Sequence, residues 1–442
     1  MHVTNLNFGD LLVPLWRGTF TCDPTDSVSS WSWAVLTGET WTKHGEAVAA
    51  CRPYLPGSYD RSPRNIAEKV NSGYKAKEWQ NYFYGLGPGL LLSVLPKPYW
   101  KHFCKLVYGV RLLHQKVIPR KHVQDAHKYL IAFHVELETL YVQRRTDRLH
   151  FVRPCLHALL HMAPETVRIG PVTLSSTWTM ERMIGFLVKQ ISLPSNPYPN
   201  LSERAVLQCQ MDAIMIQYPQ LNRASNSEPQ YSEDIGDGFI FLRARERYGH
   251  LQLGILGVKL REWFIVEETK HGNPIPANWE GPKIRKWARM RLPNGQVARC
   301  AWKETEKPPD KVRQARMVKI TYNGQIEFAE VQFYFFGIIN QKSLPLAAVK
   351  LFSRPDPTLF EESSFTLWSV TRLDDDEGVV IIPAKSILSV VAIIPHEVPG
   401  QTAQDKQRFF VWEQFGLEVA LWSEALDNPS DAADSVNLLS EE

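Results

Sequence analysis

The pattern of apolar residues changes near residue 284, and this change constrains the fold more than any other feature of the chain. Beyond it, two Asn-Gly pairs, at 294–295 and 323–324, stand between segments rich in β-branched and aromatic residues. Asn-Gly tolerates the positive φ angles of tight hairpin turns, so each pair predicts a β-hairpin. Further strands are expected at 331–339, 346–352, 379–382, 387–394 and 409–411. We therefore predict a small β-barrel or sandwich over residues 283–422.

The half of the chain before this change is predicted to be mainly helical, which makes the whole an α+β protein. Helices are expected from near Ile66, over 99–114 and 122–145, and again over 251–267. The glycine-rich segment 85–89 is expected to interrupt the helical pattern. The expected organisation is a helical unit at 1–150, a second unit at 151–222, a linker and mixed segment at 223–282 with its polar part at 223–236, the β-rich domain at 283–422, and an acidic disordered tail at 423–442.

Cysteine spacing and hydropathy limit the class of protein. The six cysteines lie far apart and form no Cys-x-x-Cys pair, which argues against a disulfide framework or a zinc ribbon. No apolar run approaches the 18 residues of a membrane span, and the first residues lack the features of a signal peptide. We therefore expect an intracellular protein with no membrane partner.

Positive charge is concentrated in one block, residues 283–319. This block holds 12 lysines and arginines against 3 acidic residues, although the whole chain has a net charge of only +3. Such a block predicts a surface that faces phosphate. The alternative is a solvated strand face. The candidate residues of this surface are Lys283, Arg285, Lys286, Arg289, Arg291, Arg299 and Lys303, and the family resemblance described below implies that their partner is DNA.

Residues 150–161 gather side chains that can bind metal. His157 and His161 are four residues apart and share one face of a helix, which is the spacing of a two-histidine metal pair. His150 and Cys155 could complete a ligand set if the chain bends at Pro154. Because the pair lacks the internal glutamate of the zinc protease motif, the competing interpretation is that these histidines are packed inside a helical core.

Two further polar groups lie near predicted helix ends. Trp178 to Arg182 read Trp-Thr-Met-Glu-Arg and open an apolar helix that follows a Gly-Pro break at 170–171. Glu181 is either an acid favoured by the helix dipole or a carboxylate ligand for a divalent cation. Arg144, Arg145 and Arg148 follow the predicted helix 122–145 and are expected to cap its C-terminus.

Several long segments carry a resemblance to a known family. They are YLPGSYDRSPRNIAEKVNSGYKAKEW, YGLGPGLL, YWKHFCKLVYGVRL, YVQRRTDRLHFVRPCLHALLHMAPE, GPxxLxSxWTMERMIG, LPSNPYPNLSERAV, MRLPNGQVARCAWKE and FYFFGIINQKSLPLAAVKLFS. Over most of residues 1–420 the chain resembles the C-terminal part of fungal CACTA-class DDE transposases, relatives of the plant En/Spm transposases.

The resemblance implies an RNase H-like core that cuts and joins DNA in the nucleus, using Mg²⁺ held by two aspartates and a glutamate. Residues 1–150 would belong to the family's helical insertion and residues 151–222 to the end of the core. Glu181 would match the glutamate, between Trp178 and Arg182. The segments with both aspartates have no counterpart here, and Met1-His2 resembles the end of the family's Asp-x-x-His element. We expect a truncated protein that holds no cofactor.

Three functions compete at this point. The first is a truncated, transposon-derived protein that is catalytically inactive alone and still binds DNA, since one carboxylate cannot hold two metal ions. The second is an interaction module that associates with itself or with a full-length transposase. The third is a metal-dependent hydrolase that uses His157, His161 and Glu181.

Overall fold

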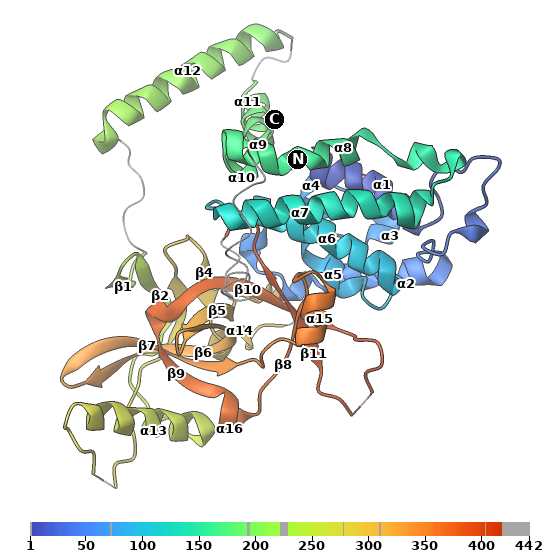
Figure 1. Ribbon diagram of the computed structural model, residues 1–442. Coiled ribbons are helices and arrows are strands. Elements are labelled where there is room, and N and C mark those ends of the chain that lie inside the picture. Colours follow the sequence, from blue (N-terminus) through green and yellow to red (C-terminus); the bar gives the residue numbers. More distant parts are fainter. Residues whose placement is uncertain are drawn as a thin grey trace.

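The computed structural model describes residues 2–70, 73–191, 195–221, 229–276, 278–308, 311–402 and 404–417. Helices occupy the chain up to residue 221, and antiparallel strands dominate it from residue 233 (Figure 1). The α+β class is therefore confirmed. The predicted tail at 423–442 lies outside the described residues.

Short helices make up the first part of the fold. Their bounds are η1 His2–Asn7, α1 Phe8–Trp16, α2 Gly38–Ala50, α3 Ile66–Lys69, α4 Ala76–Asn81, η5 Tyr82–Leu86, α5 Gly87–Leu90, α6 Lys97–Leu113, α7 Arg120–Leu137, α8 Pro154–Leu160, α9 Met162–Ile169, α10 Val172–Ser175, α11 Trp178–Lys189 and α12 Pro197–Gln217. Short segments of 3₁₀-helix or π-helix cover Val28–Ser30, Arg52–Tyr54, Gly57–Tyr59, Glu138–Val142, Thr146–Phe151 and Pro219–Leu221. The predicted helix 122–145 ends early, because Gln143 and Arg144 adopt left-handed φ angles.

The strands form one antiparallel sheet, and four helices lie between them in the sequence. The strands are β1 Glu233–Gly236, β2 Phe239–Arg245, β3 Trp287–Arg291, β4 Val297–Arg299, β5 Met317–Tyr322, β6 Gln325–Ile339, β7 Lys342–Leu351, β8 Trp368–Thr371, β9 Val379–Pro383, β10 Ile387–His396 and β11 Arg408–Glu413. The helices are α13 Gly254–Lys270, α14 Ala301–Glu304, α15 Pro357–Glu362 and α16 Asp375–Gly378, and a single turn covers Ala384–Ser386.

Strand pairing confirms both hairpins predicted from Asn-Gly. Arg291 pairs with Val297 across the first turn, and Tyr322 pairs with Gln325 across the second, where Asn323 has a φ of 50°. The linker predicted at 223–236 is wrong at its end, because residues 233–236 form β1. β1 pairs with β2 through its backbone, although its side chains are mostly polar. Polar composition alone therefore predicted a linker where the backbone forms a strand.

The sheet follows the order β1-β2-β3-β6-β5-β10-β11-β8, with β4 on β3, β7 on β6 and β9 on β7. A bridge between Phe352, just after β7, and Arg372, just after β8, links these two strands. The strands β5, β6, β8, β10 and β11 and the end of β7 therefore enclose a small apolar cluster. Its buried members are Met317, Phe328, Phe352, Val370, Val391, Ile393, Phe409 and Val411.

The helical part and the strands β10 and β11 share one core. Ala392, Ile394, Phe410 and Trp412 belong to the same buried cluster as the side chains of α1, α6 and α7. The interruption expected at 85–89 does not occur, because η5 and α5 continue α4 without a gap. Those glycines serve close packing instead: a Cβ at Gly85 would overlap the Trp412 ring and one at Gly89 the Phe410 ring.

Candidate functional site

The helix that carries Glu181 begins where the sequence predicted. Gly170 has a φ of 90° and ends α9, and α11 starts at Trp178 directly after Thr177. Glu181 lies in the first turn of α11 with its side chain 43% exposed, and its Oε1 is 3.6 Å from Nε2 of His2. Trp178 is half-buried and Arg182 is exposed. Two residues 179 positions apart in the sequence thus form an exposed pair at the base of α11.

Apolar side chains on α11 and α12 are left open to solvent. α12 has no buried residue, and it extends away from the rest of the protein in Figure 1. A helix of a globular protein normally covers its apolar residues against a neighbour, so exposure on two successive helices marks an interaction surface. The exposed apolar residues of these helices are Met180, Met183, Ile184, Phe186, Val188, Tyr198, Val206, Leu207, Met211, Ile214 and Ile216.

The histidine pair predicted on one helix face is present and exposed. His157 and His161 bring their Nε2 atoms to 3.0 Å from each other, so the interpretation of a buried pair in a helical core is wrong. His150 instead contacts the carbonyl oxygen of Thr21 at 2.6 Å, and Cys155 is buried. Among the described residues, no group of three or more His, Cys, Asp or Glu side chains that could hold a metal ion is found.

The basic block forms a groove on the strand face of β3 and β4. Arg289 of β3 is paired directly with Arg299 of β4, so their side chains leave the sheet on the same face. The groove has a volume of about 340 Å³. Its lining residues are Ala288, Arg289, Arg299, Cys300, Lys303, Glu304, Glu306 and Lys307.

The acidic residues of the groove are already paired. Glu304 is buried, lies 3.0 Å from Nη1 of Arg316 and accepts a hydrogen bond from the backbone N–H of Ala315. Glu306 holds Lys303 at 2.7 Å. Within the described part of the chain, neither Arg289 nor Lys307 forms an ion pair with an acidic side chain. The groove therefore keeps a positive charge that an anion could neutralise.

The other predicted DNA-binding residues lie outside the groove lining. Nζ of Lys286 is 5.0 Å from the centre of the Phe333 ring, and the Arg285 guanidinium is 6.0 Å from the Trp287 ring. Lys283 is exposed and Arg291 is half-buried. The structure therefore brings three of the seven predicted residues together, namely Arg289, Arg299 and Lys303.

Three exposed arginines near β3 were missing from the predicted set. Arg243 and Arg245 lie on β2, and Arg247 follows it. The register shifts between Leu242, which pairs with Arg289, and Arg245, which pairs with Trp287, so Arg245 shares the face of Arg289 and Arg243 does not. The alternation of arginine in LRARER was the available signal. This alternation was not used because residues 223–282 were predicted to be a linker and a mixed segment.

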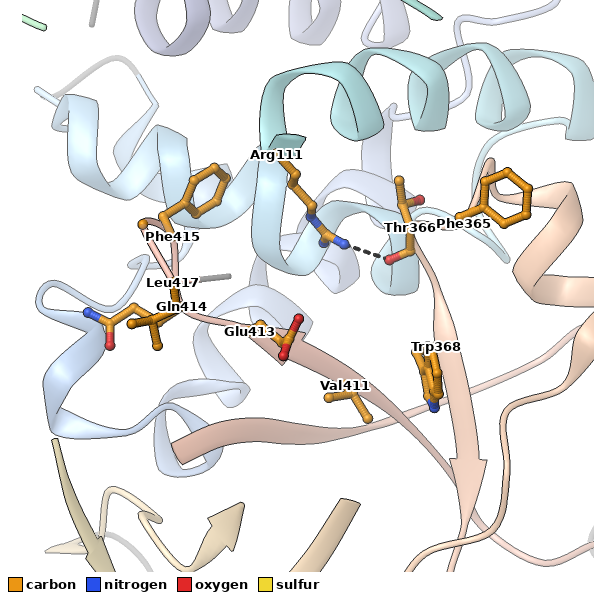
Figure 2. A pocket seen from close by; sticks show the side chains of 10 residues that line it. Arg111, Phe365, Thr366, Trp368, Val411, Glu413, Gln414, Phe415 and Leu417 are labelled. Atoms are coloured by element: carbon orange, nitrogen blue, oxygen red, sulfur yellow. Dashed lines mark hydrogen bonds between the residues drawn. The ribbon is translucent and has the colours of Figure 1, made fainter. Parts of the chain in front are cut away.

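A second, much smaller pocket of about 30 Å³ lies where the helices meet β11 (Figure 2). Arg111 donates hydrogen bonds from Nη1 to the carbonyl oxygen of Thr366 and from Nε to that of Tyr84, both at 2.7 Å. Burial lowers the pKa of Arg111 to about 10. Glu413, on the same pocket wall, is held at 2.5 Å by Lys319. This volume suits one or two water molecules, so the pocket belongs to the packing of the junction.

Comparisons of the chain with known protein families, with curated proteins and with solved structures find no match. Among the described residues, no helix is both long enough and apolar enough to cross a membrane.

Proposed function

We propose that this chain is a transposon-derived, nuclear DNA-binding protein related to the C-terminal part of CACTA-class DDE transposases. In this proposal residues 1–150 correspond to the helical insertion of that family and residues 151–222 to the end of its RNase H-like core. The observation that carries DNA binding is the groove with its paired arginines, Arg289 and Arg299.

Two arginines directly opposite each other on neighbouring strands repel each other unless an anion lies nearby. Glu304 lies 3.6 Å from Nη1 of Arg299 and offsets the charge of that arginine. In the described part of the chain Arg289 has no such acidic partner, so its charge is open to a bound anion. Lys303 and Lys307 add positive charge on the same groove. The phosphate backbone of DNA offers anions at regular spacing, and arginine binds phosphate through two parallel N–H donors. The groove therefore favours a nucleic acid backbone over a small neutral ligand.

Binding of DNA through this groove is expected to depend steeply on salt. Each phosphate neutralised by Lys or Arg contributes about −0.9 to the slope of log K against log salt concentration for duplex DNA. Arg289→Ala should weaken binding and make that slope less negative by about 1. Fluorescence anisotropy of a labelled duplex over a salt series measures both quantities.

Lys43→Ala is the matched control, because it removes one positive charge from an exposed residue of α2, already paired with Glu39. This variant should leave the affinity and the slope unchanged. If Lys43→Ala and Arg289→Ala had equal effects, the net charge of the protein rather than the groove would be responsible. Absence of duplex binding by the unaltered protein at low salt would refute DNA binding.

Two observations support the relation to the end of an RNase H-like core. His2 lies beside Glu181, and these are the two residues that the resemblance assigns to the Asp-x-x-His element and to the glutamate of the family. The exposed apolar residues of α11 and α12 fit helices whose partner surface lies in another part of a catalytic core.

We expect this polypeptide alone not to cleave or join DNA. Two-metal phosphoryl transfer requires several converging carboxylates. The side chain that lies against the Glu181 carboxylate, at 3.6 Å, is the imidazole of His2, which supplies no carboxylate. A supercoiled plasmid incubated with the purified chain and Mg²⁺ or Mn²⁺ should remain supercoiled. Metal-dependent nicking that Glu181→Ala abolishes would contradict this expectation, whereas nicking that survives Glu181→Ala would indicate a contaminating nuclease.

The exposed helices also favour the second candidate, an interaction module. Apolar residues open on both α11 and α12 require a protein partner, such as a second copy or a full transposase. Light scattering after size-exclusion chromatography distinguishes self-association from a monomer. Recovery of protein partners without any DNA binding would favour this function over the first.

A further inference from the structure

An arginine–tyrosine pair, Arg247 and Tyr248, directly follows β2. The Arg247 guanidinium is 5.3 Å from the centre of the Tyr248 ring, and the Arg245 guanidinium is 5.0 Å from the Trp287 ring. Trp287 is buried, whereas Tyr248 is 63% exposed. Tyr248 is therefore an aromatic ring held beside a cation and open to solvent.

Strand register connects this ring to the groove. Arg245 pairs with Trp287, and two residues further along β3, Arg289 pairs with Arg299. Paired residues of an antiparallel sheet share a face, so Arg245, Arg289 and Arg299 lie in one row. Beyond β2, Glu246 bonds to Lys286 and His250 to Ile284, so Tyr248 lies beside residue 285, four residues along from Arg289. At about 3.4 Å per residue this separation is about 14 Å, the length of about four stacked nucleotides of one strand.

One acidic residue lies among these arginines. Glu246 stands between Arg245 and Arg247, and its Oε2 accepts a hydrogen bond from the backbone N–H of Lys286 at 2.9 Å. This bond orients the carboxylate and leaves its negative charge in place. With Arg285, near Trp287, three arginines outnumber the one acid, so the surroundings of Tyr248 keep a net positive charge that attracts phosphate.

We propose that Tyr248 stacks on an unpaired base of a DNA strand whose phosphates follow Arg245, Arg289 and Arg299. An aromatic ring among cations binds single-stranded nucleic acid because every base has a face on which the ring can stack. The bases of a duplex already stack on each other, so the ring should add little to duplex binding. This inference rests on the proposed DNA binding and adds the single-stranded substrate class.

The chain contains a matched control for Tyr248. Tyr231 is 55% exposed and also lies under an arginine, with the Arg243 guanidinium 5.5 Å from its ring. It differs in its neighbours, because the exposed acids Glu233 and Asp234 of β1 follow it closely. These acids repel phosphate, so Tyr231 should not contribute to binding.

The test compares Tyr248→Leu, Tyr248→Phe and Tyr231→Leu by fluorescence anisotropy on a labelled single strand of about 16 nucleotides and on its duplex. Tyr248→Leu should weaken single-strand binding about 10- to 100-fold, in line with the energy of one base–aromatic stack. Tyr248→Phe keeps the ring and should bind like the unaltered protein, and so should Tyr231→Leu. Duplex binding should be unaffected by all three.

An unchanged single-strand affinity of Tyr248→Leu, or an equal loss on single strand and duplex, would overturn the inference. Failure of the unaltered protein to bind the single strand, with salt-dependent duplex binding retained, would overturn the inference and leave the proposed function standing. Failure to bind either form would refute both. Because Tyr248 is exposed, an unchanged thermal melt is expected for each variant and separates lost binding from lost folding.

Discussion

Arg148→Ala is expected to lower the free energy of unfolding by about 3–5 kcal/mol, the loss found when one partner of a buried ion pair is removed. The Arg148 side chain is 0% exposed and that of Asp26 is 1% exposed. Arg148 donates to both carboxylate oxygens of Asp26, at 2.7 Å from Nε and 2.8 Å from Nη2. Without the guanidinium, Asp26 would keep a buried charge, stabilised by Arg145 at 3.1 Å and by the hydrogen bond from the Trp31 indole at 2.8 Å.

Other contacts of Arg148 add to this loss. Its Nη1 donates to Oε1 of Gln143 at 2.6 Å, and its guanidinium lies 5.2 Å from the centre of the Trp33 ring. The cap predicted for Arg148 at a helix C-terminus is therefore wrong. Its sequence position after a helix did not reveal that Asp26, 122 residues earlier, lies against it.

Urea unfolding followed by circular dichroism measures the effect on stability. Arg168→Ala is the matched control, because Arg168 forms an exposed ion pair with Glu165 on α9, and such pairs contribute little to stability. The control should change the free energy of unfolding by less than about 0.5 kcal/mol. Equal stability of the two variants would show that the buried pair does not stabilise this fold.

The same pair should make stability depend on pH. The hydrogen bonds from Arg148 hold the pKa of Asp26 far below its usual range in the folded protein. A carboxyl with a lowered folded-state pKa stabilises the fold above its unfolded pKa of about 3.9, and this contribution is lost as the pH falls further. The difference in stability between the unaltered protein and Asp26→Asn should therefore shrink below about pH 4. A difference in stability that stays constant between about pH 6 and about pH 3 would contradict this account.

Trp412→Ala is expected to be the second large loss, about 3–5 kcal/mol, and to destabilise the helical part as well as the strands. Trp412 lies on β11, but its buried ring contacts Gly85 of η5 and the ring of Tyr59, at 4.8 Å between centres. The Tyr59 hydroxyl also donates a hydrogen bond to the Trp412 carbonyl oxygen at 2.7 Å. The indole therefore fills the junction between the two parts of the fold.

The measurement is urea unfolding followed both by the helical signal and by near-ultraviolet signals of the aromatic residues. Both transitions of Trp412→Ala should move together to lower urea, because one core includes the helices and β11. Leu388→Ala on the neighbouring β10 is the control, since Leu388 is exposed and should change stability by less than about 0.5 kcal/mol. Separate transitions for helices and strands would indicate two independently stable parts.

Part of the candidate site could be predicted from the sequence. The block 283–319 contained Arg289, Arg299 and Lys303, because charge density is visible without coordinates. Tyr248 and its arginines were missed, because residues 246–250 and 284–286 are far apart in the sequence and meet through pairing across the sheet. The approach of His2 to Glu181 was likewise invisible, since these residues are 179 positions apart in the sequence.

The sequence by itself determined the features that depend on local chemistry: the mainly helical character of the first half, the start of α11 at Trp178, and the two hairpins at Asn-Gly. Only the tertiary structure decided which of these elements share a core, that Arg289 lies opposite Arg299, and that Arg148 is buried against Asp26. The reason is that turns and helix ends depend on neighbouring residues, whereas packing and strand register join residues that are far apart in the chain.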